Sequence, residues 1–182
     1  MVTAKPTVKL TYEDYRKTPE DERYELIEGE LILAAAPNIA HQTAQGNLGS
    51  PMHTFVRTED LGYVFFSSCD VVLSEHNTFQ PDLVFVSKEN AGIITDANIQ
   101  GAPDLVVEII SPSSTGRDWV TKRDLYAKYG VKEYWLIDPI NRTLWVMRLR
   151  NGYLELSDTL YEGDTLTAST IKGFSVNISD IF

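Results

Sequence analysis

The sequence predicts an α+β or α/β fold in which a central mixed sheet is flanked by helices. Three observations lead to this prediction. Short apolar runs typical of strands recur along the chain, amphipathic helical stretches interrupt them, and no low-complexity linker divides the 182 residues. The apolar content of 43% is ordinary for a globular protein. We therefore expect one domain over residues 1–182, of which residues 1–9 form a loose leader.

The N-terminal part of the chain predicts a short helix, a hairpin and a longer helix. Thr11 is a suitable N-cap and Asp14 occupies the third helical position after it, which predicts a helix start. The run RYELIEGELIL predicts an N-terminal β-hairpin that turns at Glu28-Gly29. Residues 38–59 have helical character, and Ser50-Pro51 predicts a kink or a restart within them.

The middle and the end of the chain predict buried strands around one further helix. Strands are predicted in the apolar runs GYVFFSS, DVVLS, QPDLVFVS and PDLVVEIIS. A helix is predicted over Arg117–Tyr129 and ends at Gly130, which suits a helix C-cap. Beyond it we expect the strand VKEYWLIDP, a hairpin turning at Asn151-Gly152, and short C-terminal strands.

Charge and composition limit the classes of function. The net charge of −10 disfavours tight, nonspecific binding to nucleic-acid backbones, although an acidic cation site would also add negative charge. One cysteine, Cys69, cannot form an internal disulfide and is typical of a reducing cytoplasm. No apolar run approaches the ~20 residues that span a bilayer, so we expect no membrane association.

The tetrapeptide PDLV occurs twice, and only one of its two aspartates is placed for chemistry. If the two strands pair antiparallel around Thr95, then Asp82 lies beside Glu108, and Asp104 lies at the loop end. Neighbouring strands are ~4.8 Å apart, so Asp82 and Glu108 can share one cation. Asp104 and Glu108 lie four residues apart on one strand, about 13 Å, and cannot do so.

Glu108 is unusual because apolar residues flank it on both sides, and glutamate is rarely buried without a partner. The simpler interpretation is a glutamate paired with a basic residue, or one facing solvent at a sheet edge. The alternative is a buried functional carboxylate, which the apolar flanks favour.

Lys122 lies near the centre of the apolar stripe of its predicted helix, with Trp119, Leu125, Tyr126 and Tyr129. Such a lysine can extend its ammonium group to the surface, or it can reach an acidic cluster. Because this helix follows the strand of Glu108 after a short turn, we expect Lys122 beside Asp82 and Glu108. Two carboxylates, a divalent ion and a lysine form a set suited to phosphodiester hydrolysis.

The residues in this arrangement resemble the PD-(D/E)-x-K nuclease superfamily. Pro81-Asp82 matches its first half, and Glu108 with Ile110 stands in the place of its second half. The chain is more specifically similar to the Uma-two family of restriction-endonuclease-like bacterial proteins, a domain of unknown function. The similarity covers RYELIEGEL, QPDLVFVS, APDLVVEIISPSS, KRDLYAKYGVKEYWLIDP and the ending YEGDTLTASTIKGFSVNISDIF.

This resemblance implies a restriction-endonuclease-like core and a Mg²⁺ or Mn²⁺ ion held by Asp82, Glu108 and the backbone carbonyl of Ile109. Ile110 occupies the usual lysine position, so Lys122 would supply the lysine from the following helix. The family likeness favours Glu25 as an additional acidic residue over Glu28 and Glu30. His41 also matches a family position, where it would be structural, a phosphate contact or an accessory residue.

The leading hypothesis is a divalent-metal-dependent endonuclease in the bacterial cytoplasm, with DNA as its substrate. A homodimer would gather basic residues such as Arg117, Lys122 and Arg123 around a cleft. One alternative is a catalytically silent module that keeps the nuclease fold for binding or regulation. Another is a hydrolase of a different phosphate ester.

Overall fold

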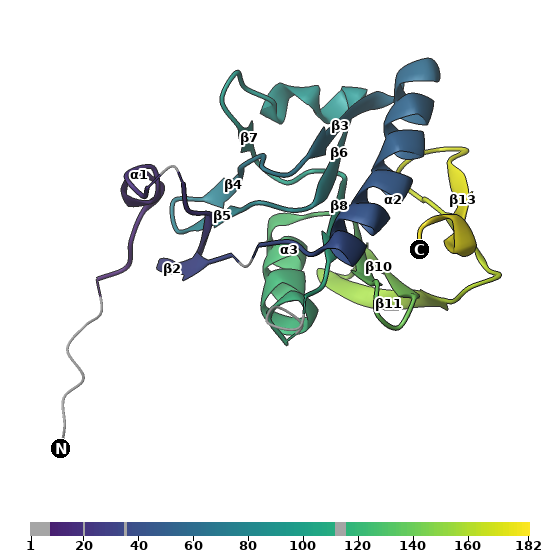
Figure 1. The fold of residues 1–182 in the computed structure, drawn as a ribbon. Helices are drawn as coiled ribbons and strands as arrows, with labels where there is room; N and C mark the ends of the chain where they lie inside the picture. Colours follow the sequence, from purple (N-terminus) through teal and green to yellow (C-terminus); the bar gives the residue numbers. More distant parts are fainter. Residues whose placement is uncertain (1–7, 20, 35, 112–115) are drawn as a thin grey trace.

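The computed structural model describes residues 8–19, 21–34, 36–111 and 116–182 (Figure 1). Residues 1–7 of the predicted leader and residues 112–115 of the turn before the last long helix lie outside this description. Thirteen strands are observed in the described ranges: β1 (Tyr24–Ile27), β2 (Glu30–Leu33), β3 (Gly62–Phe66), β4 (Val71–Ser74), β5 (Asn77–Phe79), β6 (Leu83–Ser87), β7 (Ile99–Gln100), β8 (Leu105–Ile109), β9 (Glu133–Asp138), β10 (Thr143–Arg150), β11 (Tyr153–Leu160), β12 (Thr165–Thr167) and β13 (Ser175–Asn177).

The helical elements are fewer and mostly short. They are α1 (Tyr12–Tyr15), α2 (Ile39–Thr58), η1 (Lys88–Ile93), η2 (Arg117–Lys122), α3 (Arg123–Tyr129) and η3 (Ile178–Asp180). Thr11 caps α1 as predicted, because its amide and hydroxyl both bond to the Asp14 carboxylate at 3.1 and 2.9 Å. None of the helices in the described ranges is long and apolar enough to cross a bilayer.

The centre of the fold is a six-stranded mixed sheet in the order β11-β10-β9-β8-β6-β3. Strands β8 and β9 run parallel, and every other neighbouring pair in this sheet is antiparallel. The predicted α+β architecture with a central mixed sheet is therefore confirmed. Side chains of β8 pack in core layers on both sides of the sheet, Val107 on one side and Val106 on the other, which explains its continuous apolar sequence.

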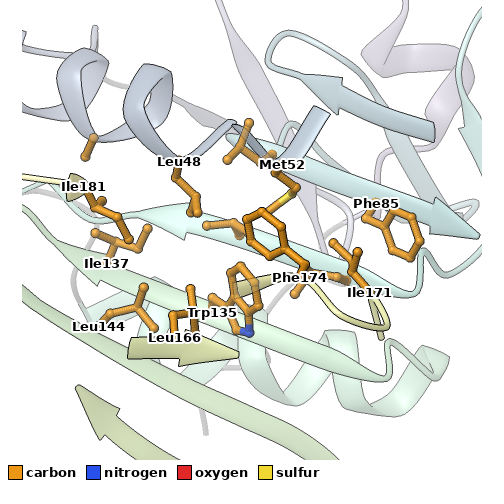
Figure 2. Close-up of a cluster of buried hydrophobic side chains, with 14 of the residues drawn as sticks. Leu48, Met52, Phe85, Trp135, Ile137, Leu144, Leu166, Ile171, Phe174 and Ile181 are labelled. Carbon is orange, nitrogen blue, oxygen red and sulfur yellow. The ribbon is translucent and has the colours of Figure 1, made fainter. Parts of the chain in front are cut away.

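One face of the six-stranded sheet packs against α2 and the C-terminal segment (Figure 2). Leu48 and Met52 of α2 and Phe174 of the C-terminal segment meet Trp135 of β9 in this layer. The restart predicted at Ser50-Pro51 was wrong, because α2 continues through Pro51 as one 20-residue helix, and the alternative of a kink stays a prediction. Pro51 lies on the exposed side of α2, while buried side chains hold the opposite side against the sheet.

The other face of this sheet packs against α3 and a second sheet of five strands, in the order β2-β1-β5-β4-β7. The predicted hairpin forms its edge, and Glu28 and Gly29 both have positive φ, as a tight hairpin turn requires. The sequence did not predict this second sheet. Its strands β5 and β7 have three and two residues, too few for a periodic pattern.

The predicted helix over Arg117–Tyr129 forms in two parts. Its first part, η2, is a π-helix, and α3 completes it with a standard α-helical pattern. Gly130 ends α3 in the left-handed conformation with a φ of 94°. The predicted apolar stripe therefore assumed an α-helical period that these first six residues do not have, yet Lys122 still faces inward and is buried. The side chain of Arg117 lies outside the description.

Candidate active site

Asp82 and Glu108 face each other across neighbouring strands, in the register that the sequence predicts. β6 pairs with β8 antiparallel, with Leu83 opposite Val107, so the next position along brings Asp82 opposite Glu108. Both side chains are buried at the end of the strand pair. Glu108 points to the same face of β8 as Val106, which is the face covered by α3.

The Asp82 carboxylate is held at both of its oxygens. Oδ2 accepts a hydrogen bond from the Ile109 amide at 2.7 Å, and Oδ1 lies 2.9 Å from the His41 ring nitrogen Nε2. The contact with Ile109 is made by its amide, and coordination of a metal by its carbonyl stays a prediction. These contacts fix the carboxylate in one orientation toward the neighbouring strand.

His41 reaches Asp82 from the first turn of α2. Asn38 caps this helix by accepting a hydrogen bond from the His41 amide at 2.9 Å, which fixes where the histidine emerges. The other ring nitrogen of His41, Nδ1, is buried without a hydrogen-bond partner among the described residues. His41 is therefore a direct neighbour of the acidic pair, and its family-based assignment to the site has a structural counterpart.

Glu108 is bound by two donors from the helix that follows it. Lys122 Nζ and the Tyr126 hydroxyl lie 2.9 and 2.7 Å from the same oxygen, Oε1. Burial raises the pKa of Tyr126 well above its usual value, and the charges of Glu108 and Glu25 raise it further. The phenol therefore stays protonated at neutral pH and can donate to Glu108.

Glu25 completes the group from the second sheet. Lys122 Nζ lies 2.9 Å from Glu25 Oε1, so the lysine bridges Glu25 and Glu108. The same Glu25 oxygen accepts a hydrogen bond from the Gln80 amide at 3.1 Å. Of the three candidate glutamates, Glu25 is the one that lies in this cluster, while Glu28 and Glu30 are exposed.

Three residues of this site were not assigned to it from the sequence. Tyr126 lies four positions after Lys122, and this helical spacing was the available signal. Gln45 donates to the backbone oxygen of Asp82 at 2.8 Å, and Gln80 binds Glu25 through its amide. No pattern in the sequence marks Gln45 or Gln80, because both act through backbone atoms that only the fold brings close.

Asp104 lies apart from this cluster, at the other end of the β6–β8 pair. Its Oδ2 accepts the Ser87 amide at 2.7 Å, and its Oδ1 lies 2.5 Å from Lys132 Nζ. Burial acts to raise the pKa of Asp104, but the bonds from Lys132 and Ser87 outweigh it and lower that pKa. Asp104 thus holds the loop after β6 against the start of β9.

The donor set of the cluster fits a hard divalent cation. Asp82, Glu108 and Glu25 with Lys122 carry two net negative charges when all four are ionised. No group of three His, Cys, Asp or Glu side chains in the described ranges is arranged to hold a metal. Mg²⁺ commonly uses only one or two carboxylates and completes its shell with water and substrate phosphate. Asp82 and Glu108 are two carboxylates on adjacent strands, which matches that number.

Comparisons with known proteins agree with this fold. A family model named Uma2 and described as "Putative restriction endonuclease" matches residues 11–179. A crystal structure of a "putative nuclease belonging to DUF820" from Anabaena variabilis superposes with a TM-score of 0.78 at 22% identity, covering 95% of this chain and 97% of that one. No curated protein sequence matches. At this identity the structural likeness shows a shared fold.

Proposed function

The chain belongs to the Uma2 family of restriction-endonuclease-like proteins, and from this premise we propose that it is a divalent-metal-dependent nuclease that hydrolyses phosphodiester bonds of DNA. The observation that carries the proposal is the pairing of buried Asp82 and Glu108 across adjacent strands, with Lys122 2.9 Å from Glu108. Buried acidic residues of this kind are costly, and such a cost is common where a protein keeps a functional site.

Asp82, Glu108 and the Ile109 carbonyl would hold Mg²⁺ or Mn²⁺. When bound, such an ion polarises a phosphate oxygen and lowers the pKa of a coordinated water. The chain's own residues prepare this site before the ion arrives. The Ile109 amide and His41 fix the orientation of Asp82, and the Tyr126 hydroxyl fixes that of Glu108.

Lys122 has two tasks in the proposed reaction. Its position between Glu25 and Glu108 stabilises the charged ammonium group in a buried setting. From there its ammonium protons can orient the attacking water or stabilise the charge that develops on the phosphoryl oxygens. Glu25 then acts by holding Lys122, and it completes the acidic cluster.

A second candidate function is a catalytically silent binding module. The observation that favours it is the engagement of Asp82, since both of its carboxylate oxygens already have partners within the chain. In that case Asp82, Glu108 and Lys122 would contribute to stability alone. A hydrolase of another phosphate ester uses the same residues and differs only in the groups that bind the substrate.

One experiment separates these functions. Cleavage of supercoiled and single-stranded DNA is measured with Mn²⁺ and with Mg²⁺, for the wild type and for Asp82→Ala, and calorimetry measures ion binding by both. The nuclease proposal expects Mn²⁺-dependent cleavage and ion binding that Asp82→Ala abolishes. If neither protein cuts and Asp82→Ala loses no ion binding, the silent module is correct.

The proposal also includes a cytoplasmic location and a homodimer. In a dimer, basic residues such as Arg123, which is partly exposed and pairs with Asp124, would gather near the substrate. Sedimentation at micromolar concentration tests this part, and a monomer over the whole concentration range would contradict it.

A further inference from the structure

We propose that the edge strand β3 and the adjoining side of α2 form a groove that binds a single-stranded segment of nucleic acid next to the cleaved bond. This inference rests on the proposed function and adds the form of its substrate. The groove is defined by Phe66 and Tyr63 of β3, His53 and Arg57 of α2, and Lys88 at the start of η1.

The two elements that border the groove are both bonded to the backbone of the candidate active site. The backbone amide of Ser67, directly after β3, donates to the Asp82 carbonyl at 3.1 Å. The Gln45 side chain of α2 bonds to the Ser67 hydroxyl at 3.0 Å and to that same carbonyl at 2.8 Å. The end of β3 and the first half of α2 therefore meet at Asp82.

From that point α2 and β3 run side by side and in opposite directions to the far end of the sheet. The Leu61 amide bonds to the Val56 carbonyl at 2.9 Å, which closes the short connection between the two elements. Four residues of strand separate Phe66 from Gly62, a length of about 13 Å. The far end of β3 thus lies away from Asp82 by a distance that two or three nucleotides of an extended strand would cover.

The far end of the groove is an open cleft of about 330 Å³. His53, Arg57, Tyr63 and Lys88 contribute to its lining. This volume lies within the usual range for small-ligand sites, about 300–1,000 Å³. A single base with its sugar is a ligand of suitable size.

Aromatic side chains of β3 border the groove and remain partly exposed to solvent. Tyr63 is 48% exposed, and its ring stacks against that of Phe65 at 6.4 Å on one face of β3. Phe66 is 39% exposed and points to the other face, where its ring lies 6.4 Å from that of His53. β3 is the last strand of its sheet, so no neighbouring strand covers its outer side. Exposed rings along a strand are the platforms on which unpaired bases stack.

Arg57, Lys88 and Asp60 line the cleft and leave one net positive charge there, on a chain that is acidic as a whole. Arg57 is exposed and forms no ion pair with any residue in the described ranges. Lys88 is also exposed and pairs with Asp60 at the surface. A few cations suit a strand with few phosphates, whereas a duplex would bring many more charges near a protein of net charge −10. We therefore infer a single strand as the occupant.

Binding measurements test this groove separately from catalysis. A cleavage-deficient Glu108→Gln protein is titrated into labelled single-stranded DNA of about 12 nucleotides and into a duplex of equal length, at low salt. Fluorescence anisotropy reports both affinities. The double substitution Arg57→Gln/Tyr63→Ala in this protein alters the groove, and Arg150→Gln/Tyr153→Ala makes the same changes at exposed positions near the opposite edge of the sheet.

The groove predicts tighter binding of the single strand than of the duplex. It also predicts that Arg57→Gln/Tyr63→Ala weakens single-strand binding about tenfold or more, while the control pair changes it less than about twofold. Thermal unfolding checks that all the variants are folded. Three results would each overturn the groove. The protein binds the duplex more tightly, it does not bind the single strand, or both double variants lose the same amount of affinity for the single strand.

The same experiment distinguishes this inference from the proposed function. Cleavage by the wild type with no effect of Arg57→Gln/Tyr63→Ala on binding would refute the groove and leave the nuclease intact. A selective loss of binding in a protein that never cleaves would support the groove and refute hydrolysis. If Tyr63→Ala instead separates a dimer without changing affinity for DNA, β3 binds a second copy of the chain and the groove is refuted.

Discussion

Two copies of the tetrapeptide Pro-Asp-Leu-Val enter neighbouring strands of one sheet, yet their aspartates have different surroundings. Asp82 meets Ile109 and His41 and faces Glu108, within a group of buried acidic residues around Lys122. Asp104 instead binds the Ser87 amide, the Asn90 side chain and the exposed Lys132. Both aspartates are buried, so burial alone does not distinguish them.

The difference arises from the direction of the strands. Because β6 and β8 are antiparallel, the first residue of each copy lies at an opposite end of the same pair. One end receives the first turn of α2 and the helix carrying Lys122, and the other end receives the loop after β6. Identical local sequences therefore acquire different chemistry from the elements that converge on each end.

The largest expected effect comes from neutralising each aspartate in turn. Asp82→Asn should lower Mn²⁺-dependent cleavage about a thousandfold, because a lost metal ligand removes several kcal/mol of transition-state stabilisation. Asp104→Asn should leave the rate per folded molecule within about threefold of the wild type. A cleavage assay normalised to the folded fraction measures both rates. Equal losses of rate in the two variants would contradict the assignment of Asp82 as catalytic and Asp104 as structural.

Removing the lysine partner of each acidic site should affect stability by different amounts. Lys122→Met leaves Glu25 and Glu108 buried without their shared cation and should cost about 3–5 kcal/mol of unfolding free energy. Lys132→Met removes a partner whose side chain is 62% exposed and should cost about 1 kcal/mol or less. Urea unfolding provides both values, and a larger loss for Lys132→Met would contradict this assignment.

The smallest effect concerns the acid limb of stability. Bonds from Lys132 and Ser87 lower the pKa of Asp104 in the folded protein. Its contribution is therefore present above the unfolded pKa of about 3.9 and disappears as the pH falls through the lower folded value. Asp104→Asn should make the free energy of unfolding less dependent on pH below about 4. If the slope of the unfolding free energy against pH is the same in Asp104→Asn as in the wild type, then Asp104 does not contribute to this pH dependence.

The strand pairing could be predicted from the sequence because it depends on local information. Two apolar runs and a loop between them defined one antiparallel register, and the observed pairing of Leu83 with Val107 has that register. Burial of Glu108 followed from its apolar flanks, and the inward direction of Lys122 followed from the stripe on its helix. In each case the pattern in a short stretch of sequence was enough to predict where the residue lies.

The remaining features depend on contacts between distant segments. The five-stranded sheet contains strands too short to show a period, and the π-helical turns of η2 have no recognised sequence signal. The Gln45 side chain donates to the backbone oxygen of Asp82, and the Gln80 backbone amide donates to the carboxylate of Glu25, in both cases across a long stretch of chain. His41 could be linked to the site by family likeness, but its contact with Asp82 required the fold of α2.

The most direct test of the central claim is the anomalous scattering of Mn²⁺ in crystals of the wild-type protein. We predict a peak about 2.0–2.6 Å from carboxylate oxygens of both Asp82 and Glu108, with none beside Asp104. Crystals of Asp82→Asn with the same Mn²⁺ concentration should show no peak at that position. A peak beside Asp104, or none between Asp82 and Glu108 at saturating Mn²⁺, would contradict the assignment of catalytic and structural aspartates.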